Sequence, residues 1–210
     1  MEEKRHGMMF VLSSPSGAGK TTLTRKIAEN NPNFTISISC TTRKPRPNEI
    51  NGKDYHFHNE KSFNSLIKKN DFFEYAKIFD NFYGTLKQKT LDLLTSGKDV
   101  LFDIDWQGTQ QLKKIENLNL VTFFIIPPNI QVLRKRLLNR HAGEKSLVEE
   151  RMNKFNEEIS HWKEYDWVLV NDYLETCYND ILNIIFQENK GMKNKQDKKI
   201  IEKKINILVK

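Results

Sequence analysis

Short apolar runs alternate with longer segments of mixed polarity along most of the chain. Four of these runs are apolar enough for strands buried on both faces, and they cover residues 8–12, 99–105, 120–126 and 167–170. In the segments that follow, apolar residues recur at helical spacing, which predicts helices over 20–29, 107–116, 130–139, 146–165 and 174–188. The alternation of strands and helices predicts the α/β class, with a parallel sheet flanked by helices.

The interval from 35 to 89 follows a different pattern. Short alternating segments rich in aromatic residues occur at 34–39, 55–57, 72–76 and 81–84, and Asn51-Gly52 is typical of a tight hairpin turn. We therefore expect a small mixed, mostly β subdomain inserted into the core. A polar break at 140–145 indicates a second insertion, a short lid. The predicted divisions of this single domain are a core of 8–34, 90–138 and 153–188, an insertion of 35–89, a lid of 139–152 and a tail of 190–210.

Length and composition narrow the class of protein. A chain of 210 residues suits one α/β domain with insertions, and no apolar run is long enough to cross a membrane. The apolar stretch near the N-terminus is too short for a secretory signal, so we expect a cytoplasmic protein with no membrane partner. Cys40 and Cys177 form no metal or redox motif and are expected to be free thiols. The sequence admits a homo-oligomer without specifying one.

His56 and His58 would share one face of a strand, which is compatible with a metal site. Because no third ligand stands nearby in the sequence, a surface or packing role is favoured.

Most of the net charge of +7 lies in the C-terminal segment 190–210, which contains eight lysines and two acidic residues. Such a tail is typical of a solvated extension, although Ile200, Ile201 and the apolar residues of 205–209 would also suit a short docked helix. Because the rest of the chain is nearly neutral, we expect no specific nucleic-acid partner.

The segment after the first predicted strand has the pattern of a phosphate-binding loop. It reads Ser14-Pro15-Ser16-Gly17-Ala18-Gly19-Lys20-Thr21-Thr22. Its small residues let backbone N–H groups surround a polyphosphate, and the helix that follows adds partial positive charge. Ser14 replaces the first glycine of G-x-x-x-x-G-K-[ST], so an ordinary strand-to-helix turn is the alternative, but Gly-Lys-Thr stands in register. We expect a nucleoside triphosphate, with Lys20 on its β- and γ-phosphates and Thr21 on Mg²⁺.

Further cations suit phosphoryl transfer, which depends on clamping a polyanion. Arg43 and Arg46 stand in a proline-restrained segment and would suit a phosphate monoester. Around the expected lid stand Arg136, Arg140 and Arg151. A solvated surface charge is the alternative for each arginine.

Two carboxylates, Asp103 and Asp105, end the second predicted core strand, and their spacing places them on one strand face. Asp103 is predicted to orient Mg²⁺ in the manner of a Walker B residue. The alternative is helix capping, since Asp105 immediately precedes a predicted helix.

The chain resembles the guanylate kinase family through an ordered series of motifs over about residues 8–188. Besides the phosphate loop, these motifs lie at 37–46, 51–57, 73–74, 83–85, 103–108 and 126–128. The resemblance implies a P-loop NTPase fold and transfer of the γ-phosphoryl group of ATP to GMP, with dGMP as a second acceptor, in purine nucleotide metabolism. It also implies that ATP and Mg²⁺ are bound and that ADP and GDP are the products.

The resemblance also implies roles for individual residues. The GMP phosphate would be held by Arg43, Arg46, Tyr55 and Tyr83. Guanine would be read by Ser39, Glu74 and Thr85, with Asp105 near its amino group. The ATP side would be served by Arg136, Arg140 and Arg151, with Asn171 near the adenine. The catalytic residues would be Lys20, Arg43 and the three lid arginines.

Elementary chemistry supports these roles independently. Guanine presents N1–H and N2–H₂ donors side by side, and the Glu74 carboxylate can accept from both, whereas adenine has an acceptor at N1. A site built on such hydrogen bonds rejects the wrong base by roughly 10⁴-fold. The GMP phosphate is already an anion, so the reaction needs arginines that cancel repulsion rather than a general base.

Three other functions are compatible with parts of the sequence. A guanylate-kinase-like binding module without catalysis is disfavoured by the intact Gly19-Lys20-Thr21 and by the single-domain length. A related kinase with another phosphoryl acceptor is disfavoured by Ser39 together with Glu74. A nucleic-acid-binding protein is disfavoured because the positive charge is confined to the tail.

Overall fold

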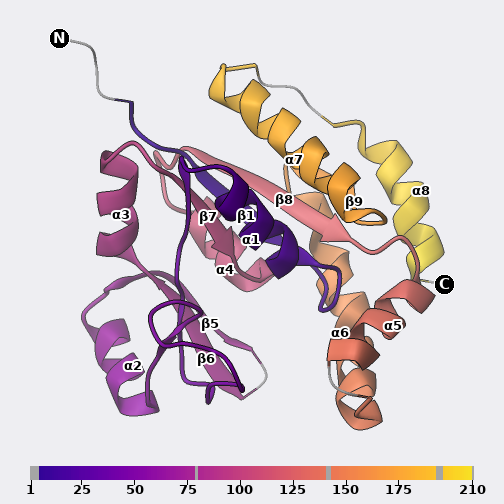
Figure 1. Ribbon diagram of the computed structural model, residues 1–210, viewed down its shortest axis with the longest axis horizontal. Coiled ribbons are helices and arrows are strands. Elements are labelled where there is room, and N and C mark those ends of the chain that lie inside the picture. Colours follow the sequence, from indigo (N-terminus) through magenta and orange to yellow (C-terminus); the bar gives the residue numbers. More distant parts are fainter. Residues whose placement is uncertain (1–4, 79, 141–142, 193–195, 210) are drawn as a thin grey trace. The chain divides into compact units, whose positions relative to one another are not determined.

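The structure is a computed structural model that describes residues 5–78, 80–140, 143–192 and 196–209. Its strands form two sheets (Figure 1). The five-stranded parallel sheet has the order β2-β7-β1-β8-β9, and the four-stranded mixed sheet has the order β4-β3-β6-β5. This confirms the predicted α/β class with a parallel sheet and a second, small mixed sheet.

The apolar pattern predicted the core elements, and the structure shifts only their ends. The parallel sheet contains β1 (Met9–Ser13), β2 (Phe34–Ile36), β7 (Asp99–Asp103), β8 (Leu120–Ile126) and β9 (Trp167–Val170). The mixed sheet contains β3 (Cys40–Thr41), β4 (His56–Phe57), β5 (Phe72–Ile78) and β6 (Asn81–Leu86). The helices are α1 (Lys20–Asn30), α2 (Glu60–Lys68), α3 (Lys87–Thr95), α4 (Trp106–Lys113), α5 (Ile130–Arg140), α6 (Lys145–Ser160), the short 3₁₀ helix η1 (His161–Glu164), α7 (Leu174–Asn189) and α8 (Lys198–Leu208). Within the described residues, no helix is long and apolar enough to cross a membrane.

Residue contacts divide the chain into two compact units. Unit 1 comprises Met1–Phe10 and Pro32–Leu120, and unit 2 comprises Val11–Asn31 and Val121–Lys210. Unit 1 contains the mixed sheet, and unit 2 contains the phosphate loop together with the C-terminal helices.

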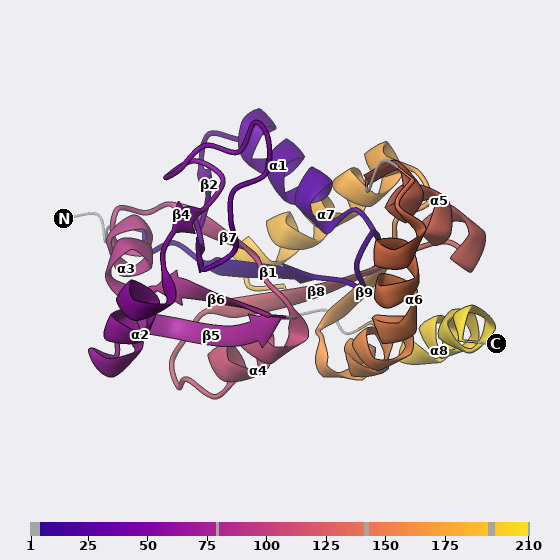
Figure 2. The same cartoon turned by 90° about the horizontal axis from the view of Figure 1, so that it is seen from below.

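The mixed sheet of unit 1 combines two antiparallel pairs with one parallel pair, and its long strands β5 and β6 lie side by side in Figure 2. β6 pairs antiparallel with both β5 and β3, and β3 runs parallel to β4. The hairpin expected at Asn51-Gly52 is therefore wrong. Residues 51–55 instead close a turn before β4, in which Asn51 bridges Tyr55 and the Gly52 N–H donates to the Tyr55 carbonyl at 2.7 Å. Parallel strands need a longer connection than a two-residue turn supplies, which explains why the cue failed.

The apolar pattern does not predict three further features of unit 1. Residues 34–36 form β2, which pairs with β7 in the parallel sheet, although we expected this stretch among the strands of the insertion. Helices α2 and α3 also lie where only strands and turns were expected. α2 covers the mixed sheet through Phe63, whose ring stacks on Phe72 at a centroid distance of 4.7 Å. A strand of three half-buried residues has no pattern strong enough to reveal which sheet it joins.

Both cysteines are buried free thiols, as the composition predicted. Burial raises the pKa of Cys40 to about 11 and the pKa of Cys177 to about 12. Both side chains therefore act as small apolar groups in their cores.

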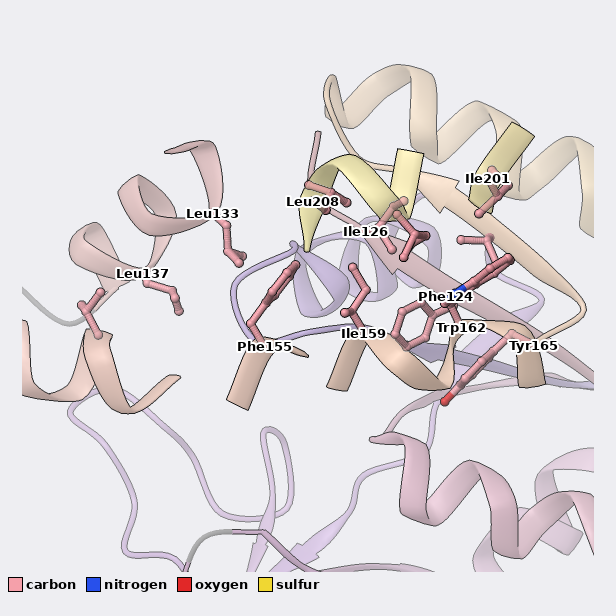
Figure 3. Close-up of a cluster of buried hydrophobic side chains, with 13 residues drawn as sticks. Phe124, Ile126, Leu133, Leu137, Phe155, Ile159, Trp162, Tyr165, Ile201 and Leu208 are labelled. Atoms are coloured by element: carbon pink, nitrogen blue, oxygen red, sulfur yellow. The ribbon is translucent and has the colours of Figure 1, made fainter. Parts of the chain in front are cut away.

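Unit 2 is held together by an apolar cluster that joins β8, α5, α6, η1 and β9 to the C-terminal helix (Figure 3). α8 contributes Ile201, Ile205 and Leu208, whose spacing places them on one helix face. Asp197 caps the helix by accepting the N–H of Lys199 at 3.0 Å. Of the two alternatives for the basic tail, the docked helix is confirmed for 198–208; residues 193–195 and 210 lie outside the described residues.

Candidate active site

The phosphate loop of unit 2 turns tightly between β1 and α1. Gly17 and Gly19 have φ of 89° and 101°, a region that favours glycine. A Cβ atom at Gly17 would lie 2.9 Å from Cδ2 of Leu137, and one at Gly19 would overlap Nδ2 of Asn171. Only glycine fits both the conformation and the space, so the loop has the shape that the sequence predicted.

The carbonyl of Ala18 anchors this loop to the rest of unit 2. It accepts a hydrogen bond of 2.8 Å from Nδ2 of the buried Asn171 and one of 3.3 Å from Nη1 of Arg136. Nη2 of Arg136 also donates to the carbonyl of Asn171 at 3.0 Å. Because a peptide is planar and trans, fixing the Ala18 carbonyl aims the N–H of Gly19 the opposite way. The structure thus places two residues expected on the ATP side as supports of the phosphate loop.

Ser16 is a second anchor of the loop. Its backbone N–H donates to Oε2 of Glu158 at 2.9 Å, and its Oγ accepts from Nη1 of Arg151 at 3.1 Å. Arg151 and Glu158 both belong to α6 and are separated by two helical turns, so they lie along one side of it. The sequence predicted Arg151 as a site residue but carried no signal for Glu158, because a glutamate in a polar helix is ordinarily solvated.

The loop leads into α1 at Lys20 and Thr21. Gly19 is the N-cap residue and provides no side-chain cap, so the first turn keeps backbone donors for an anion. Arg140 lies exposed at the end of α5. The expected lid, 139–152, covers the end of α5 and the start of α6, and residues 141–142 lie outside the described part of the chain.

In unit 1, three residues far apart in sequence converge on one face of the mixed sheet. Glu74 of β5 stands directly opposite Thr85 of β6, and the register of β3 with β6, continued by one residue, brings Ser39 to Thr85. Their exposed fractions are 3%, 0% and 9%. None of the residues that the structure describes offers a hydrogen-bond partner to the buried Oγ1 of Thr85, which is costly unless a ligand supplies one. These are the residues that the resemblance assigned to guanine.

Helix α4 packs against β5, the edge strand of the mixed sheet that carries Glu74. Its Gln111 side chain donates to the Tyr75 carbonyl at 2.8 Å and accepts the Tyr75 N–H at 3.1 Å, and so closes the open edge of β5. A Cβ atom at Gly108 would lie 2.5 Å from Oε2 of Glu74. The glycine therefore makes room for the carboxylate, a contact that sequence patterns do not reveal.

The residues expected at the GMP phosphate also come together in unit 1. The guanidinium of Arg43 lies 5.3 Å from the ring centre of Tyr55, and the rings of Tyr55 and Tyr83 are 6.0 Å apart. Burial and the nearby Asp103 carboxylate raise the pKa of Tyr55 to about 12, so this phenol stays a hydrogen-bond donor at neutral pH.

Glu49 is a member of this cluster that the sequence analysis missed. Its carboxylate accepts 2.8 Å and 2.7 Å hydrogen bonds from Nη2 of Arg43 and from the backbone N–H of Arg46. Burial, the largest single influence, would lower the pKa of Arg43, but the hydrogen bonds and charges of Glu49 and Tyr83 together outweigh it, and the pKa is raised. The sequence signal that could have revealed Glu49 is its position three residues after Arg46, close enough for an ion pair with the arginines.

Asp103 and Asp105 do not share a strand face, which corrects the expectation for this pair. β7 ends at Asp103, and Asp105 is the N-cap of α4, accepting the N–H of Gly108 at 3.0 Å. The alternative of helix capping is therefore correct for Asp105. Because β7 ends at Asp103, strand periodicity no longer sets the direction of the Asp105 side chain, and its hydrogen bond at the start of α4 does.

The two histidines contact polar neighbours. Nε2 of His56 lies 3.1 Å from Nζ of Lys89, and Nδ1 of His58 lies 3.3 Å from Oγ of Ser62. Burial lowers the pKa of both imidazoles, so they are neutral at pH 7. Across the described ranges, no group of three or more His, Cys, Asp or Glu residues is arranged to hold a metal ion.

A glycine-shaped phosphate loop after the first strand of a parallel sheet, with arginines and a buried carboxylate on a separate mixed sheet, defines a P-loop nucleotide kinase. The sequence pattern of the family described as "Guanylate kinase" matches residues 6–188 of this chain. The chain belongs to the guanylate kinase family. The resemblance, the fold and the class of enzyme expected from the sequence are thereby confirmed.

Individual relatives agree with the family match. The chain is 49% identical over 184 residues to a guanylate kinase of Paramagnetospirillum magneticum, covering 88% of this chain and 86% of that protein. It is 48% identical over 187 residues to a guanylate kinase of Rickettsia bellii, covering 89% and 97%. A crystal structure of guanylate kinase from Anaplasma phagocytophilum matches with a TM-score of 0.74 at 34% identity, covering 88% of this chain and 87% of that one.

Proposed function

We propose that the chain transfers the γ-phosphoryl group of ATP to GMP, with dGMP as a second acceptor, and that unit 1 holds the acceptor and unit 2 the donor. The observation that carries the assignment of residues is the convergence of Ser39, Glu74 and Thr85 on one buried face of the mixed sheet. In the proposed divisions, the insertion of 35–89 is the GMP-binding part and 139–152 is the lid.

On the acceptor side, Glu74 accepts the N1–H and N2–H₂ groups of guanine, while Ser39 and Thr85 complete its hydrogen bonds. Asp105 is assigned to the guanine amino group: its Oδ1 accepts from the Gly108 N–H and its Oδ2 from the Gln107 side chain, and a carboxylate oxygen can accept a second hydrogen bond. Arg43, Arg46, Tyr55 and Tyr83 hold the phosphate. Since this set addresses the base and the phosphate, it does not depend on the ribose 2′-hydroxyl, and dGMP is expected to react.

On the donor side, the loop N–H groups and Lys20 hold the β- and γ-phosphates of ATP. The lid arginines Arg140 and Arg151 neutralise charge that develops on the transferring phosphoryl group. Arg136 and Asn171 act by fixing the Ala18 carbonyl. Both acceptor and donor are polyanions, so alignment and charge neutralisation supply the catalysis, and no side chain needs to remove a proton.

The hydroxyl oxygen of Thr21 and the carboxylate oxygens of Asp103 are ligands that suit Mg²⁺, so these two residues would hold the ion. Phosphate oxygens and waters would be its other ligands. When bound, the ion neutralises charge on the β- and γ-phosphates. Thr21 is exposed at the start of α1, where its hydroxyl is available as a ligand.

A coupled ADP-release assay tests the proposal, with ATP·Mg²⁺ as donor and GMP, dGMP, AMP, CMP, UMP or dTMP as acceptor. Turnover confined to GMP and dGMP is expected. Comparable turnover with AMP would contradict the role of Glu74. Turnover with GMP but not with dGMP would mean that the ribose is read as well.

A further inference from the structure

The C-terminal segment from Lys190 onward lies beyond residues 6–188, which the family description matches. We infer that this segment positions the phosphate loop, an inference that rests on the proposed function. In this inference α8 packs in the same core as α6, and Glu158 of α6 accepts the backbone N–H of Ser16 in the loop. Each link of this chain of contacts lies within unit 2.

The first link is the attachment of α8 to α6. Ile201, Ile205 and Leu208 of α8 belong to the same apolar cluster as Phe155 and Ile159 of α6, and Figure 3 draws this cluster. All of these residues are at most 7% exposed. Loss of α8 would expose apolar surface of this shared cluster to water, which costs about 25 cal/mol per Å².

Polar contacts fix the same segment in register. Nζ of Lys198 donates to the carbonyls of Lys163 and Tyr165 at 2.7 and 2.8 Å, and Lys163 pairs with Glu202 at 2.8 Å. Gln196 pairs with both backbone groups of Val168 at 2.8 Å. Val168 is on β9, the last strand of the parallel sheet, so Gln196 also covers an open sheet edge.

The second link is the contact of α6 with the phosphate loop. Glu158 directly precedes the buried Ile159, so a shift of the packed face of α6 moves the carboxylate that accepts the Ser16 N–H. Arg151, on the same side of α6, donates to Ser16 Oγ. Glu158 is therefore a positioning residue, which acts on ATP through the loop rather than by touching it.

Paired variants of the full chain test the inference. Glu158→Gln removes the charge of the acceptor, and Glu157→Gln is its matched control on the adjacent, exposed position. Ile205→Ala with Leu208→Ala loosens α8, and Ile200→Ala with Ile207→Ala is the control, since these side chains are 61% and 74% exposed. We expect the first member of each pair to raise the KM for ATP roughly tenfold, the factor of one charge-assisted hydrogen bond. The KM for GMP and both controls should stay unchanged.

A double-mutant cycle then decides whether α8 acts through Glu158. In the Glu158→Gln background, the Ile205→Ala/Leu208→Ala pair should add little to the KM for ATP, because the contact that it disturbs is already weakened. Additive effects would overturn the inference. So would an equal rise of the KM for ATP and GMP, or a lower melting temperature with unchanged KM values, since each indicates a purely structural helix.

Calorimetric titration with a non-hydrolysable ATP analogue keeps this test separate from the proposed function. If no acceptor is phosphorylated, a weaker Kd for the analogue in the Glu158 and α8 variants would still support the positioning role. An unchanged Kd in both would refute it, whatever the acceptor.

Discussion

Oε1 of Glu49 accepts a 2.8 Å hydrogen bond from Nη2 of Arg43, and only 15% of the arginine side chain and 16% of the glutamate side chain are exposed. The same carboxylate accepts the backbone N–H of Arg46 at 2.7 Å. One side chain thus sets the direction of the first arginine and the backbone position of the second. Pre-orientation of this kind lowers the cost of binding a phosphate, because the guanidinium groups are already ordered.

Replacing Glu49 by alanine should therefore raise the KM for GMP by about tenfold, or about 1.4 kcal/mol, and leave the KM for ATP unchanged. Steady-state kinetics with each substrate varied in turn would measure both values. Glu60→Ala, an exposed position at the start of α2 in the same unit, is a suitable control. A lower KM for GMP would show instead that Glu49 competes with the phosphate.

Glu49 also makes stability depend on pH. Burial, the largest single influence, would raise the pKa of this carboxyl, but the hydrogen bonds from Arg43 and the Arg46 backbone and the charges of both arginines together outweigh it, so the pKa lies below its usual 4.5. A lowered pKa stabilises the fold above the usual value, and the contribution is lost as the pH falls through the folded-state pKa. Urea unfolding from pH 7 down to about pH 3 should show wild type more stable than Glu49→Gln at neutral pH, with the difference vanishing in acid. A difference that is constant with pH would exclude ionisation of Glu49 as its source.

The sequence was sufficient for elements whose pattern is local. The strand 120–126 and the strand 167–170 were predicted to the residue, because continuous apolar runs next to proline or polar residues have sharp ends. The phosphate loop was predicted from the spacing of its residues, because Gly17 and Gly19 have positive φ angles that other residues rarely adopt. Strand β2 was misplaced because its partner, β7, lies more than sixty residues away.

Contacts between distant segments account for the rest of the site. Glu158 touches a loop 142 residues away, and nothing around it in the sequence marks that contact. Asp105 was expected on a strand face, but the sheet ends two residues earlier and the start of α4 takes its carboxylate. Glu49 was overlooked because a glutamate near two arginines is usually a solvated ion pair.

Lys20→Ala should lower kcat by roughly 10²–10³-fold, the usual cost of removing one group that stabilises charge in a transition state. Because Lys20 lies at the first position of α1, alanine preserves the helix, and the melting temperature should stay close to wild type. Lys26→Ala, which removes an ion pair with Glu175 and a cation–π contact with Tyr178 on the same helix, is the matched control and should keep full activity. A near-normal rate for Lys20→Ala would remove this lysine from the catalytic set.

Glu74→Gln exchanges one acceptor oxygen for a donor that faces the N1–H and N2–H₂ groups of guanine. Since hydrogen bonds to charged groups contribute about 1.5–3 kcal/mol, the KM for GMP should rise by roughly 10–100-fold. The KM for ATP should change by less than about twofold, because Glu74 lies in the unit assigned to the acceptor. An equal loss for both nucleotides would make Glu74 a structural residue and would leave the base without an identified reader.

Gly108→Ala distinguishes the effect of this glycine on the Glu74 carboxylate from its effect on the stability of α4. Alanine is favoured over glycine inside a helix by about 1 kcal/mol, so α4 itself should not be weakened. Its Cβ atom would, however, lie 2.5 Å from Oε2 of Glu74, and the carboxylate must move. We expect the KM for GMP to rise at least tenfold without loss of thermal stability, a penalty comparable to one lost charged hydrogen bond. In a Glu74→Ala background the same substitution should cost nothing further, because the group that the methyl displaces is gone. If the two effects were additive, Gly108 would act on GMP by a route other than Glu74, and the close packing of α4 on β5 would have to be tested through Gln111 instead.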